Sequence, residues 1–180
     1  AASDVYKRQG NGSLKKGRDM WSYNPKINRA IKLPPSMMSQ SWMGSDFSND
    51  DLAKSDSILE DYDHAVIDRQ VVNGHEVFTV QSTAREDAPV VWGKQILLIR
   101  DDFILLREQF FDEDMILVKE MTAENLVDFS GRIFPRIWTM RRADKKDRFT
   151  RLEYEILEFD VDIEDRLFTL TSLKSKKRLR

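Results

Sequence analysis

The dipeptide Asn73-Gly74 constrains the fold of this chain more than any other feature of its sequence. It separates two runs rich in β-branched and aromatic residues, 65–72 and 75–81, and both of its residues accept the positive φ of a type I′ turn. The sequence therefore predicts a β-hairpin whose two-residue loop pairs Val72 with His75 and Ile67 with Val80.

Alternation along this hairpin predicts one buried face and one largely solvated face. The buried face would collect the apolar side chains of Ala65, Ile67, Val71, Phe78 and Val80. The solvated face would carry His64, Asp68, Gln70, Thr79 and Gln81.

Polar turns recur farther along the chain, at Asp101-Asp102 and at residues 112–114 and 143–147. Short strands separated by turns at nearly regular spacing favour an antiparallel meander over alternating strands and helices. The register around Asp101 stays open, because the apolar run 103–106 permits several alignments.

The region from Thr150 to Ile163 reads as one long strand whose alternation changes phase. Apolar residues stand at even positions up to Ile156 and at odd positions from Leu157 onward. A β-bulge at Ile156-Leu157 would return every apolar side chain to one face and bend the strand. A strand that leaves its neighbour and crosses to another layer explains the pattern equally well.

Helix signals are few and short. Ser48-Asn49-Asp50-Asp51 before Leu52 is typical of a capped helix start, and residues 125–127 suit another brief turn. Gly44 is expected to supply a positive φ, which would fold its loop against the sheet. We expect Asp46 to cap the following helix, in preference to contacting a polar ligand group.

Composition limits the class of protein. A chain of 180 residues suits one sizeable core and therefore a single domain. The formal net charge of -2 disfavours a nucleic-acid binder, and no apolar run approaches the ~20 residues that cross a bilayer. Because cysteine is absent, disulfide scaffolds and thiolate chemistry are excluded.

The sequence predicts no enzyme, cofactor or metal site. His64 and His75 are the two histidines of the chain, and in the proposed hairpin they stand about eight strand steps of ~3.3 Å apart, too far to share a metal ion. The acidic residues fall in turns or on polar strand faces, where solvation is the ordinary explanation. No nucleophile elbow, phosphate-binding loop or His-Glu-x-x-His motif is present.

The segment 17–52 is instead typical of an apolar binding surface. Two Trp, one Tyr, one Phe and four Met lie within it, and aromatic rings and flexible thioethers make adaptable apolar contacts. The competing interpretation is that these side chains fill the protein's own core, where large apolar residues usually lie.

The same segment resembles a known family. Its motifs Gly17-x-Asp19-Met20-Trp21-x-Tyr23-x-Pro25 and Ser41-Trp42-Met43-Gly44-Ser45-Asp46-Phe47 resemble those of bacterial outer membrane lipoprotein-sorting proteins, relatives of the periplasmic carrier LolA. The resemblance continues through Val91-Trp92-Gly93-Lys94 and Gly131-Arg132-Ile133-Phe134-Pro135, so it spans roughly residues 11–174. It implies a curved antiparallel sheet, an incomplete barrel with short covering helices, whose concave face holds acyl chains and performs no catalysis.

The start of the chain is interpreted separately. Residues 4–9 resemble the translation, in one reading frame, of a transposon-end DNA sequence that is used to prepare sequencing libraries. Residues 1–9 are therefore interpreted as non-native or disordered and are excluded from the predicted fold. The expected domain is a single LolA-like domain over residues 10–174 that lacks its N-terminal part and export signal. Residues 175–180 are expected to form a basic tail.

Together these features predict a non-enzymatic periplasmic carrier of lipid or lipoprotein acyl chains, with an inner-membrane transporter as a further partner. Its contact with membranes would be peripheral or transient. The alternative is an envelope interaction module that docks on a transporter or signalling protein without a ligand. The expected ligand contacts are Trp21, Tyr23, Met37, Met38, Trp42, Met43, Phe47, Trp92 and Trp138.

Overall fold

A computed structural model describes residues 3–8, 11–17, 19–53, 57–145 and 147–174 of the chain. The basic tail and residues 1, 2 and 9 of the excluded segment lie outside the described residues. Contacts divide the chain into two compact units, where the sequence predicted a single domain. The first unit comprises Ala1–Gln40, Ser48–Ser55 and Asp160–Arg180, and the second comprises Ser41–Phe47 and Asp56–Phe159.

The first unit is built on a four-stranded antiparallel sheet in the order β1-β2-β3-β4. Its core contains the buried side chains of Leu14, Tyr23 and Leu173. The strands are β1 (Ser3–Arg8), β2 (Asn11–Lys16), β3 (Asp19–Asn24) and β4 (Arg29–Lys32), and the helices are η1 (Pro35–Met37), α1 (Asn49–Ala53), η3 (Asp165–Leu167) and α3 (Leu170–Lys174). Sequence reasoning missed β2, β3 and β4, because four to six residues give too short a stretch of alternation.

Strand β1 lies within the segment that the sequence interpretation excluded. It pairs with β2 along its whole length, from Ser3 opposite Lys16 to Arg8 opposite Asn11. Residues 3–8 are therefore paired within the sheet, while the expectation that the segment is non-native stays a prediction.

The start of α1 follows the predicted capping pattern. The Ser48 hydroxyl accepts the backbone N–H of Asp51 at 3.2 Å, and the Asp51 carboxylate accepts the backbone N–H of Ser48 at 2.7 Å. This reciprocal pair satisfies two donors at the helix start. The predicted helix is confirmed, with Ser48 and not Asp46 as its cap.

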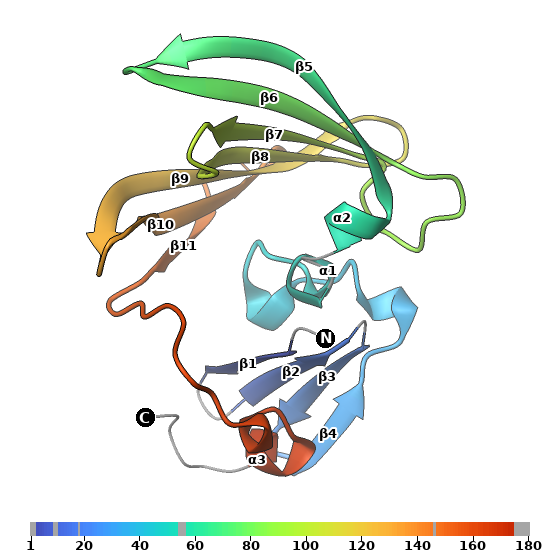
Figure 1. Cartoon of the computed structure of the whole chain (residues 1–180). Helices are drawn as coiled ribbons and strands as arrows, with labels where there is room; N and C mark the ends of the chain where they lie inside the picture. The colour runs from blue at the N-terminus through green and yellow to red at the C-terminus, as the bar shows by residue number, and fades with distance from the viewer. Residues whose placement is uncertain (1–2, 9–10, 18, 54–56, 146, 175–180) are drawn as a thin grey trace. The chain divides into compact units, whose positions relative to one another are not determined.

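The second unit is built on a seven-stranded antiparallel sheet in the order β11-β10-β9-β8-β7-β6-β5. Every strand pairs with its neighbours in sequence, so the predicted meander is confirmed. The strands are β5 (Tyr62–Val72), β6 (His75–Ala84), β7 (Lys94–Arg100), β8 (Leu105–Phe111), β9 (Leu117–Phe129), β10 (Arg132–Arg142) and β11 (Phe149–Glu153), with η2 (Trp42–Gly44) and α2 (Ser57–Glu60) beside them. The sheet is strongly curved, and its edge strands β5 and β11 do not pair with each other, so it stays an open half barrel (Figure 1).

The β5–β6 hairpin keeps the predicted turn and changes the predicted register. Asn73 and Gly74 have φ of 53° and 83°, and Val72 pairs with His75. The register shifts between Val66 and Asp68, however, so Val66 and not Ile67 stands opposite Val80. Ile67 is the extra residue of a β-bulge, a feature that bends the bulged strand.

The predicted buried face of this hairpin is also wrong for β5. Every residue of the strand after Tyr62 is exposed, including Val66 at 62% and Val71 at 70%. As an edge strand, β5 has a neighbouring strand on one side alone, and the exposure of alternate residues along it shows that neither of its faces is covered beyond Tyr62. Alternation in the sequence indicates a strand and cannot tell whether another element covers it.

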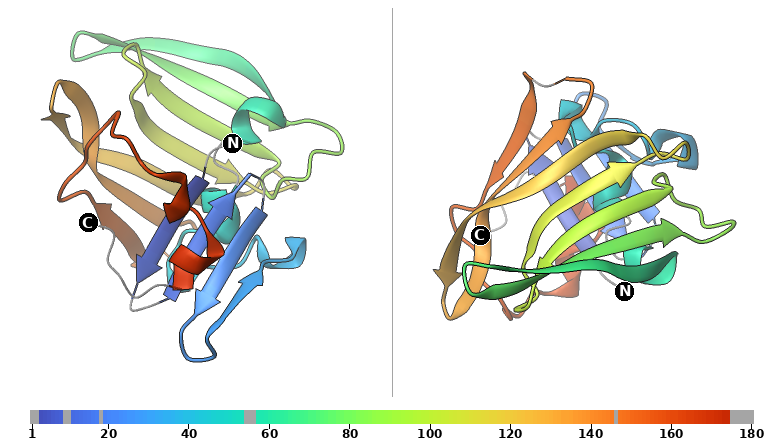
Figure 2. Two further views of the ribbon diagram at one scale, coloured as in Figure 1. Left: turned by 60° about the horizontal axis from the view of Figure 1, so that its bottom comes forward. Right: turned by 90° about the horizontal axis from the view of Figure 1, so that it is seen from above.

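Two further register shifts lie in the middle of the sheet. One falls between Leu98 and Ile99 of β7, and the other between Phe110 and Phe111 of β8. Bulges raise the local twist and coil of a strand pair. Together with the shift in β5, they contribute to the curvature that two viewing directions show (Figure 2).

The predicted long strand after Thr150 is wrong. Strand β11 ends at Glu153, and residues 154–164 form no strand, so neither a bulge at Ile156-Leu157 nor a crossing strand exists. The rings of Tyr154 and Phe159 instead pack edge-on against Phe134, with centroid distances of 6.0 and 5.7 Å. The Tyr154 backbone N–H still donates to the Arg136 carbonyl at 2.9 Å, and aromatic packing holds the chain beyond it.

The brief helical turn predicted at residues 125–127 is also wrong, because these residues lie inside β9. Asn125 does adopt a left-handed φ of 55°, while its neighbours Glu124 and Leu126 keep their partners Ile137 and Pro135. Asn125 thus adopts the backbone conformation that Asn often takes in turns. The strand nevertheless continues, because the residues on both sides of Asn125 stay paired with β10.

Candidate functional site

The inner face of the seven-stranded sheet is the side that carries the buried core of the second unit. Residues directly opposite each other on paired strands point to the same face. One row of such partners crosses six strands, and we call it the apolar row: Met140, Met121, Glu108, Leu97, Val80 and Val66. All but Glu108 are apolar, so the row forms an almost continuous apolar band.

One end of the apolar row is covered. Phe47 and Trp92 pack with Phe110 and Met140 as a buried cluster, and Trp42, Val91, Val118 and Met121 surround it. The rings of Trp92 and Phe110 meet edge-on with centroids 5.5 Å apart. The Tyr62 hydroxyl donates to the Trp92 carbonyl at 2.7 Å, which fixes the Trp92 segment.

The segment Ser41–Phe47 forms part of that cover. Its ends are joined because the backbone N–H of Trp42 donates to the Phe47 carbonyl at 2.7 Å. Gly44 turns the segment with a φ of 75°, as predicted. Asp46 does not cap a helix: its carboxylate accepts the hydroxyl proton of Thr150 at 2.8 Å, and its N–H donates to the same oxygen at 2.9 Å. The predicted role of Asp46 as a cap is therefore wrong.

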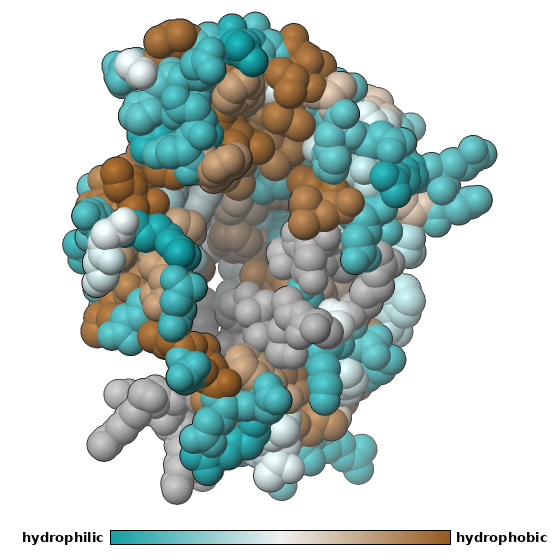
Figure 3. Space-filling view, in the orientation of Figure 1, coloured by the Kyte–Doolittle hydropathy of each residue, from teal (hydrophilic) through white to brown (hydrophobic). Residues whose placement is uncertain are grey.

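The other end of the apolar row is open. Exposure rises along the row from 0% at Met140 through 9% at Leu97 to 62% at Val66. Apolar side chains lie among polar ones on the visible side of β5 and β6 (Figure 3). Accessible apolar area that continues a buried core is characteristic of a binding surface.

A second row on the same inner face is polar and largely buried. This polar row contains Arg142, Lys119, Phe110, Gln95, Ser82 and His64. Lys119, Gln95 and Ser82 are 2%, 6% and 0% exposed. The Ser82 hydroxyl and His64 Nδ1 are joined by a hydrogen bond of 2.8 Å, so this ring nitrogen of His64 already has a partner within the row.

The Lys119 ammonium rests on two aromatic rings. Its Nζ lies 4.6 Å from the centroid of Trp92 and 5.0 Å from that of Phe110. Cation–π attraction of this kind offsets part of the cost of removing an ammonium from water. Lys119 is thus a buried cation that lies beside two aromatic rings on the inner face.

A cluster of aromatic side chains lies on the inner face next to β10, on the side of Met140 that points away from Arg142. Phe134 contacts Trp138, Tyr154 and Phe159 edge-on, with centroids 5.7 to 6.3 Å away. Burial raises the pKa of the Tyr154 hydroxyl. The group extends the apolar area, and the Arg132 guanidinium lies 4.5 Å from the centroid of Phe159.

The outer face of the sheet is polar by contrast. The Thr139 hydroxyl donates to Glu124 at 2.8 Å, and the Gln109 amide donates to Glu120 at 2.7 Å. These side chains stand opposite the apolar row on the same strands. The two faces of the sheet are thus chemically distinct.

The nine predicted ligand contacts divide between the two units. Trp21, Tyr23, Met37 and Met38 belong to the first unit, where Tyr23 and Met38 are buried. Trp42, Met43, Phe47, Trp92 and Trp138 belong to the second unit, and four of these lie in or beside the inner-face groups described above. The apolar row itself was missed, although the alternation along each strand could have indicated which residues share a face.

Among the described residues, no three His, Cys, Asp or Glu side chains lie close enough together to hold a metal ion. The carboxylates with lowered pKa are Asp101, Asp102 and Asp144, which lie in turns and bind His75, Arg100 and Arg142 respectively. Within the described part of the chain, no helix is long and apolar enough to span a membrane.

The chain is similar to known proteins in sequence and in fold. A family model described as "Uncharacterized protein" matches residues 4–175. No curated protein matches the chain.

Solved structures with the same fold include a DUF1329 family protein from Desulfovibrio piger, with 24% identity, a TM-score of 0.80, and coverage of 91% of this chain and 71% of that one. A domain described as an outer membrane lipoprotein-sorting protein from Vibrio parahaemolyticus has 21% identity and a TM-score of 0.81, with 94% and 74% covered. A LolA superfamily protein from Nitrosomonas europaea has 23% identity and a TM-score of 0.70, with 90% and 71% covered. The fold is therefore LolA-like, as the sequence resemblance implied.

Proposed function

The chain belongs to the family whose model matches residues 4–175, and on that premise we propose that it is a non-enzymatic carrier of lipid or lipoprotein acyl chains. The periplasm is the proposed compartment, and an inner-membrane transporter is the proposed source or recipient of the cargo. Two solved structures of this fold are described as a lipoprotein-sorting protein and a LolA superfamily protein, which supports the proposal.

One observation carries it: the apolar row continues from a buried core into accessible surface on the inner side of an open, curved sheet. An alkyl chain laid along Leu97, Val80 and Val66 would gain about 0.8 kcal/mol for each CH₂ removed from water. The nine contacts predicted from the sequence stay part of the proposal. Of those in the second unit, Trp42, Phe47, Trp92 and Trp138 lie in or beside the groups on the same face.

A direct binding measurement tests the proposal. Protein expressed in bacteria and purified without detergent is expected to retain lipid that mass spectrometry detects. The purified protein is also expected to bind a fluorescent long-chain acyl probe, and the Val80→Asp variant should weaken that binding by at least about tenfold, because it places a charge in the apolar row.

Thr79 provides the matched control. It neighbours Val80 on β6 and points to the outer face, so the Thr79→Asp variant adds the same charge to the same strand on the other side. The proposal fails when wild-type protein carries no lipid and binds no acyl probe, or when the two variants weaken binding equally.

A second candidate function is a docking module of the envelope that carries no ligand. Phe103 favours it, because this ring is 92% exposed at the β7–β8 turn and its backbone has a left-handed φ of 66°. A bulky residue in that conformation is uncommon. Lipid-free protein that captures an envelope partner, with capture lost in the Phe103→Ser variant, would support this function over the carrier.

A further inference from the structure

The β3–β4 hairpin ends in a turn, residues 24–29, that is exposed along its whole length. Side-chain hydrogen bonds order this turn. The Lys26 N–H donates to the side-chain oxygen of Asn24 at 2.9 Å. The Tyr23 hydroxyl donates to the side-chain oxygen of Asn28 at 3.1 Å, and Asn28 has a left-handed φ of 49°. The turn is therefore preorganised, so little conformational freedom is lost when a partner binds it.

The charge of this hairpin has one sign. The sequence has no acidic residue in the stretch 20–45, which carries the cations Lys26, Arg29 and Lys32. Lys32 already pairs with Asp19 at 2.7 Å. Within the described part of the chain, neither Lys26 nor Arg29 has a carboxylate at ion-pair distance. Two exposed cations at the end of the hairpin are thus available to an anionic partner.

Apolar side chains lie directly beside these two cations. Ile27 follows Lys26 in the turn and is 55% exposed, and Ile31 is 52% exposed on β4. Arg29 and Ile31 are two residues apart on this strand, so they share one face of the sheet. Exposed aliphatic groups next to cations suit the interface of an anionic bilayer, where head groups attract the cations and the acyl boundary accepts the aliphatic groups.

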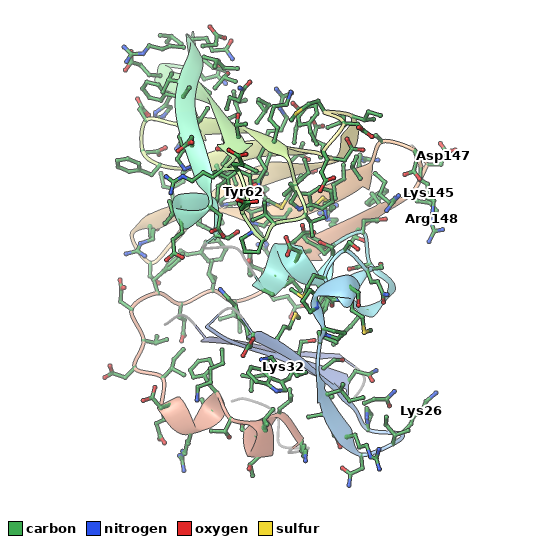
Figure 4. The ribbon with its side chains drawn as sticks, turned by 90° about the vertical axis from the view of Figure 1, so that its right-hand side faces the viewer. Lys26, Lys32, Tyr62, Lys145, Asp147 and Arg148 are labelled. Carbon is green, nitrogen blue, oxygen red and sulfur yellow. The ribbon has the colours of Figure 1, made fainter. Side chains whose placement is uncertain are left out.

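The size of this surface favours a membrane over a protein partner. A stable protein interface usually takes about 20–30 residues from each side. The exposed turn is much smaller, and Lys26 points away from the sheet at its far end (Figure 4). A bilayer needs no larger complementary surface, because a few apolar and basic side chains bind it reversibly.

We propose that the β3–β4 hairpin docks on the surface of an anionic phospholipid bilayer. Ile27 enters the boundary between head groups and acyl chains, and the Lys26 ammonium and the Arg29 guanidinium bind lipid phosphates. The contact is peripheral and reversible, because a single turn makes it. The inference rests on this hairpin and does not require the proposed carrier function.

Binding to vesicles tests the proposal. The purified protein is titrated with vesicles of phosphatidylcholine alone and with vesicles that also contain about 30% phosphatidylglycerol, and bound protein is measured after sedimentation. Wild-type protein is expected to bind the anionic vesicles about tenfold or more tightly, because each cation near an anionic surface contributes roughly a factor of five. Raising the salt from about 0.05 M to about 0.5 M should remove most of that preference, because exposed charges are screened.

Substitutions in the turn separate the two parts of the contact. Lys26→Gln/Arg29→Gln removes both cations, so binding to anionic vesicles should fall to within about twofold of binding to neutral ones. Ile27→Ser removes the aliphatic group and keeps both charges, so binding should fall severalfold while its salt dependence stays. All three residues are exposed, so the variants should keep the fold, which circular dichroism checks.

The second unit supplies a matched control for each substitution. Lys145→Gln/Arg148→Gln removes two exposed cations from the β10–β11 turn, where Asp147 offsets part of their charge (Figure 4). Ile116→Ser changes an isoleucine that is 61% exposed in the β8–β9 turn, next to the acidic run 112–114. Both controls should bind anionic vesicles within about twofold of wild type, because neither turn combines an aliphatic group with unopposed cations.

The inference is overturned when wild-type protein binds neither kind of vesicle or binds both equally, or when the controls weaken binding as much as the turn variants do. An acidic protein as the true partner would give the first of these results. The acyl-probe assay separates the inference from the carrier function, since the turn variants should bind the probe as wild type does. Vesicle binding without probe binding refutes the carrier function alone, and the reverse result refutes this inference alone.

Discussion

Asp46 and Thr150 are linked by two hydrogen bonds through one hydroxyl group. The Thr150 Oγ1 accepts the Asp46 backbone N–H at 2.9 Å and donates to the Asp46 carboxylate at 2.8 Å. The two residues are 104 positions apart in sequence, so this pair fastens the segment Ser41–Phe47 to the edge strand β11. Through it, the cover of the apolar row depends on a strand far away in the chain.

We expect Thr150→Val to lower the free energy of unfolding of the second unit by about 1–3 kcal/mol, because it leaves both partly buried groups of Asp46 without this partner. Chemical denaturation measures the change. Thr150→Ser keeps the hydroxyl and should cost much less than Val. Equal effects of the two substitutions would show that the methyl group, and not the hydrogen bonds, matters.

A second prediction concerns the buried end of the apolar row. Met140 is 0% exposed, so Met140→Ala should destabilise the second unit by about 2–5 kcal/mol through lost apolar burial and the cavity that remains. Met115 is 47% exposed at the β8–β9 turn, and Met115→Ala should change stability by no more than about 0.5 kcal/mol. Thermal or denaturant unfolding of both variants checks the difference.

A third prediction concerns Gly93 within the motif Val91-Trp92-Gly93-Lys94. A Cβ added there would stand 2.8 Å from the Asp112 carbonyl oxygen and 3.2 Å from the Glu113 Cα. Backbone atoms cannot yield cheaply, so Gly93→Ala should cost about 1–3 kcal/mol and shift the β8–β9 turn. Amide chemical shifts of residues 112–116 would report that movement.

Gly74→Ala serves as the contrast to Gly93→Ala. Its added Cβ would meet nothing within 4 Å, but its φ is +83°. The expected cost is about 1–2 kcal/mol from backbone strain alone, with no displacement of neighbouring elements. Asn at this position tolerates the left-handed region and should recover part of the loss.

A fourth prediction concerns pH. The hydrogen bond from His75 lowers the pKa of the Asp101 carboxyl group. Because the pKa is lowered in the folded state, this interaction stabilises the fold above the ordinary Asp pKa of about 3.9, and the stabilisation is lost as the pH falls through the lower, folded value. Carboxyl NMR titration should place Asp101 below the usual range, and His75→Ala should return it toward that range.

Asp144 is the control in the same titration. Its pKa is lowered chiefly by the hydrogen bond from Arg142, at the opposite end of the sheet's strands. It should not respond to His75→Ala. A parallel change in both carboxyls would indicate a global effect of the substitution on the fold.

The meander was predictable because its turns are chemically explicit. Asn73-Gly74 and the polar turns at Asp101-Asp102 and residues 112–114 each separate apolar runs of strand length, and the structure has a strand pair at each. The link 143–147 joins β10 to β11 as expected, although residue 146 lies outside the described residues. Local turn chemistry and alternation therefore indicate these four strand pairs, whereas the links from β6 to β7 and from β9 to β10 were not predicted.

Register and burial were less predictable, since they depend on partners that sequence patterns do not reveal. The bulge at Ile67 shifts half of the β5–β6 ladder by one residue, and no residue type marks it. The residues that follow β11 contact β10 through the rings of Tyr154 and Phe159 against Phe134, which is distant in sequence. The burial of Lys119 likewise depends on Trp92 and Phe110.

The bulge in β5 has a consequence for the solubility of this long edge strand. An extra residue exchanges the backbone groups that point inward with those that point outward, so the free edge changes phase between Val66 and Asp68. A foreign strand arriving in register with residues 62–66 falls out of register with residues 68–72. The irregularity that helps to bend the sheet thereby also protects an exposed strand from templating aggregation.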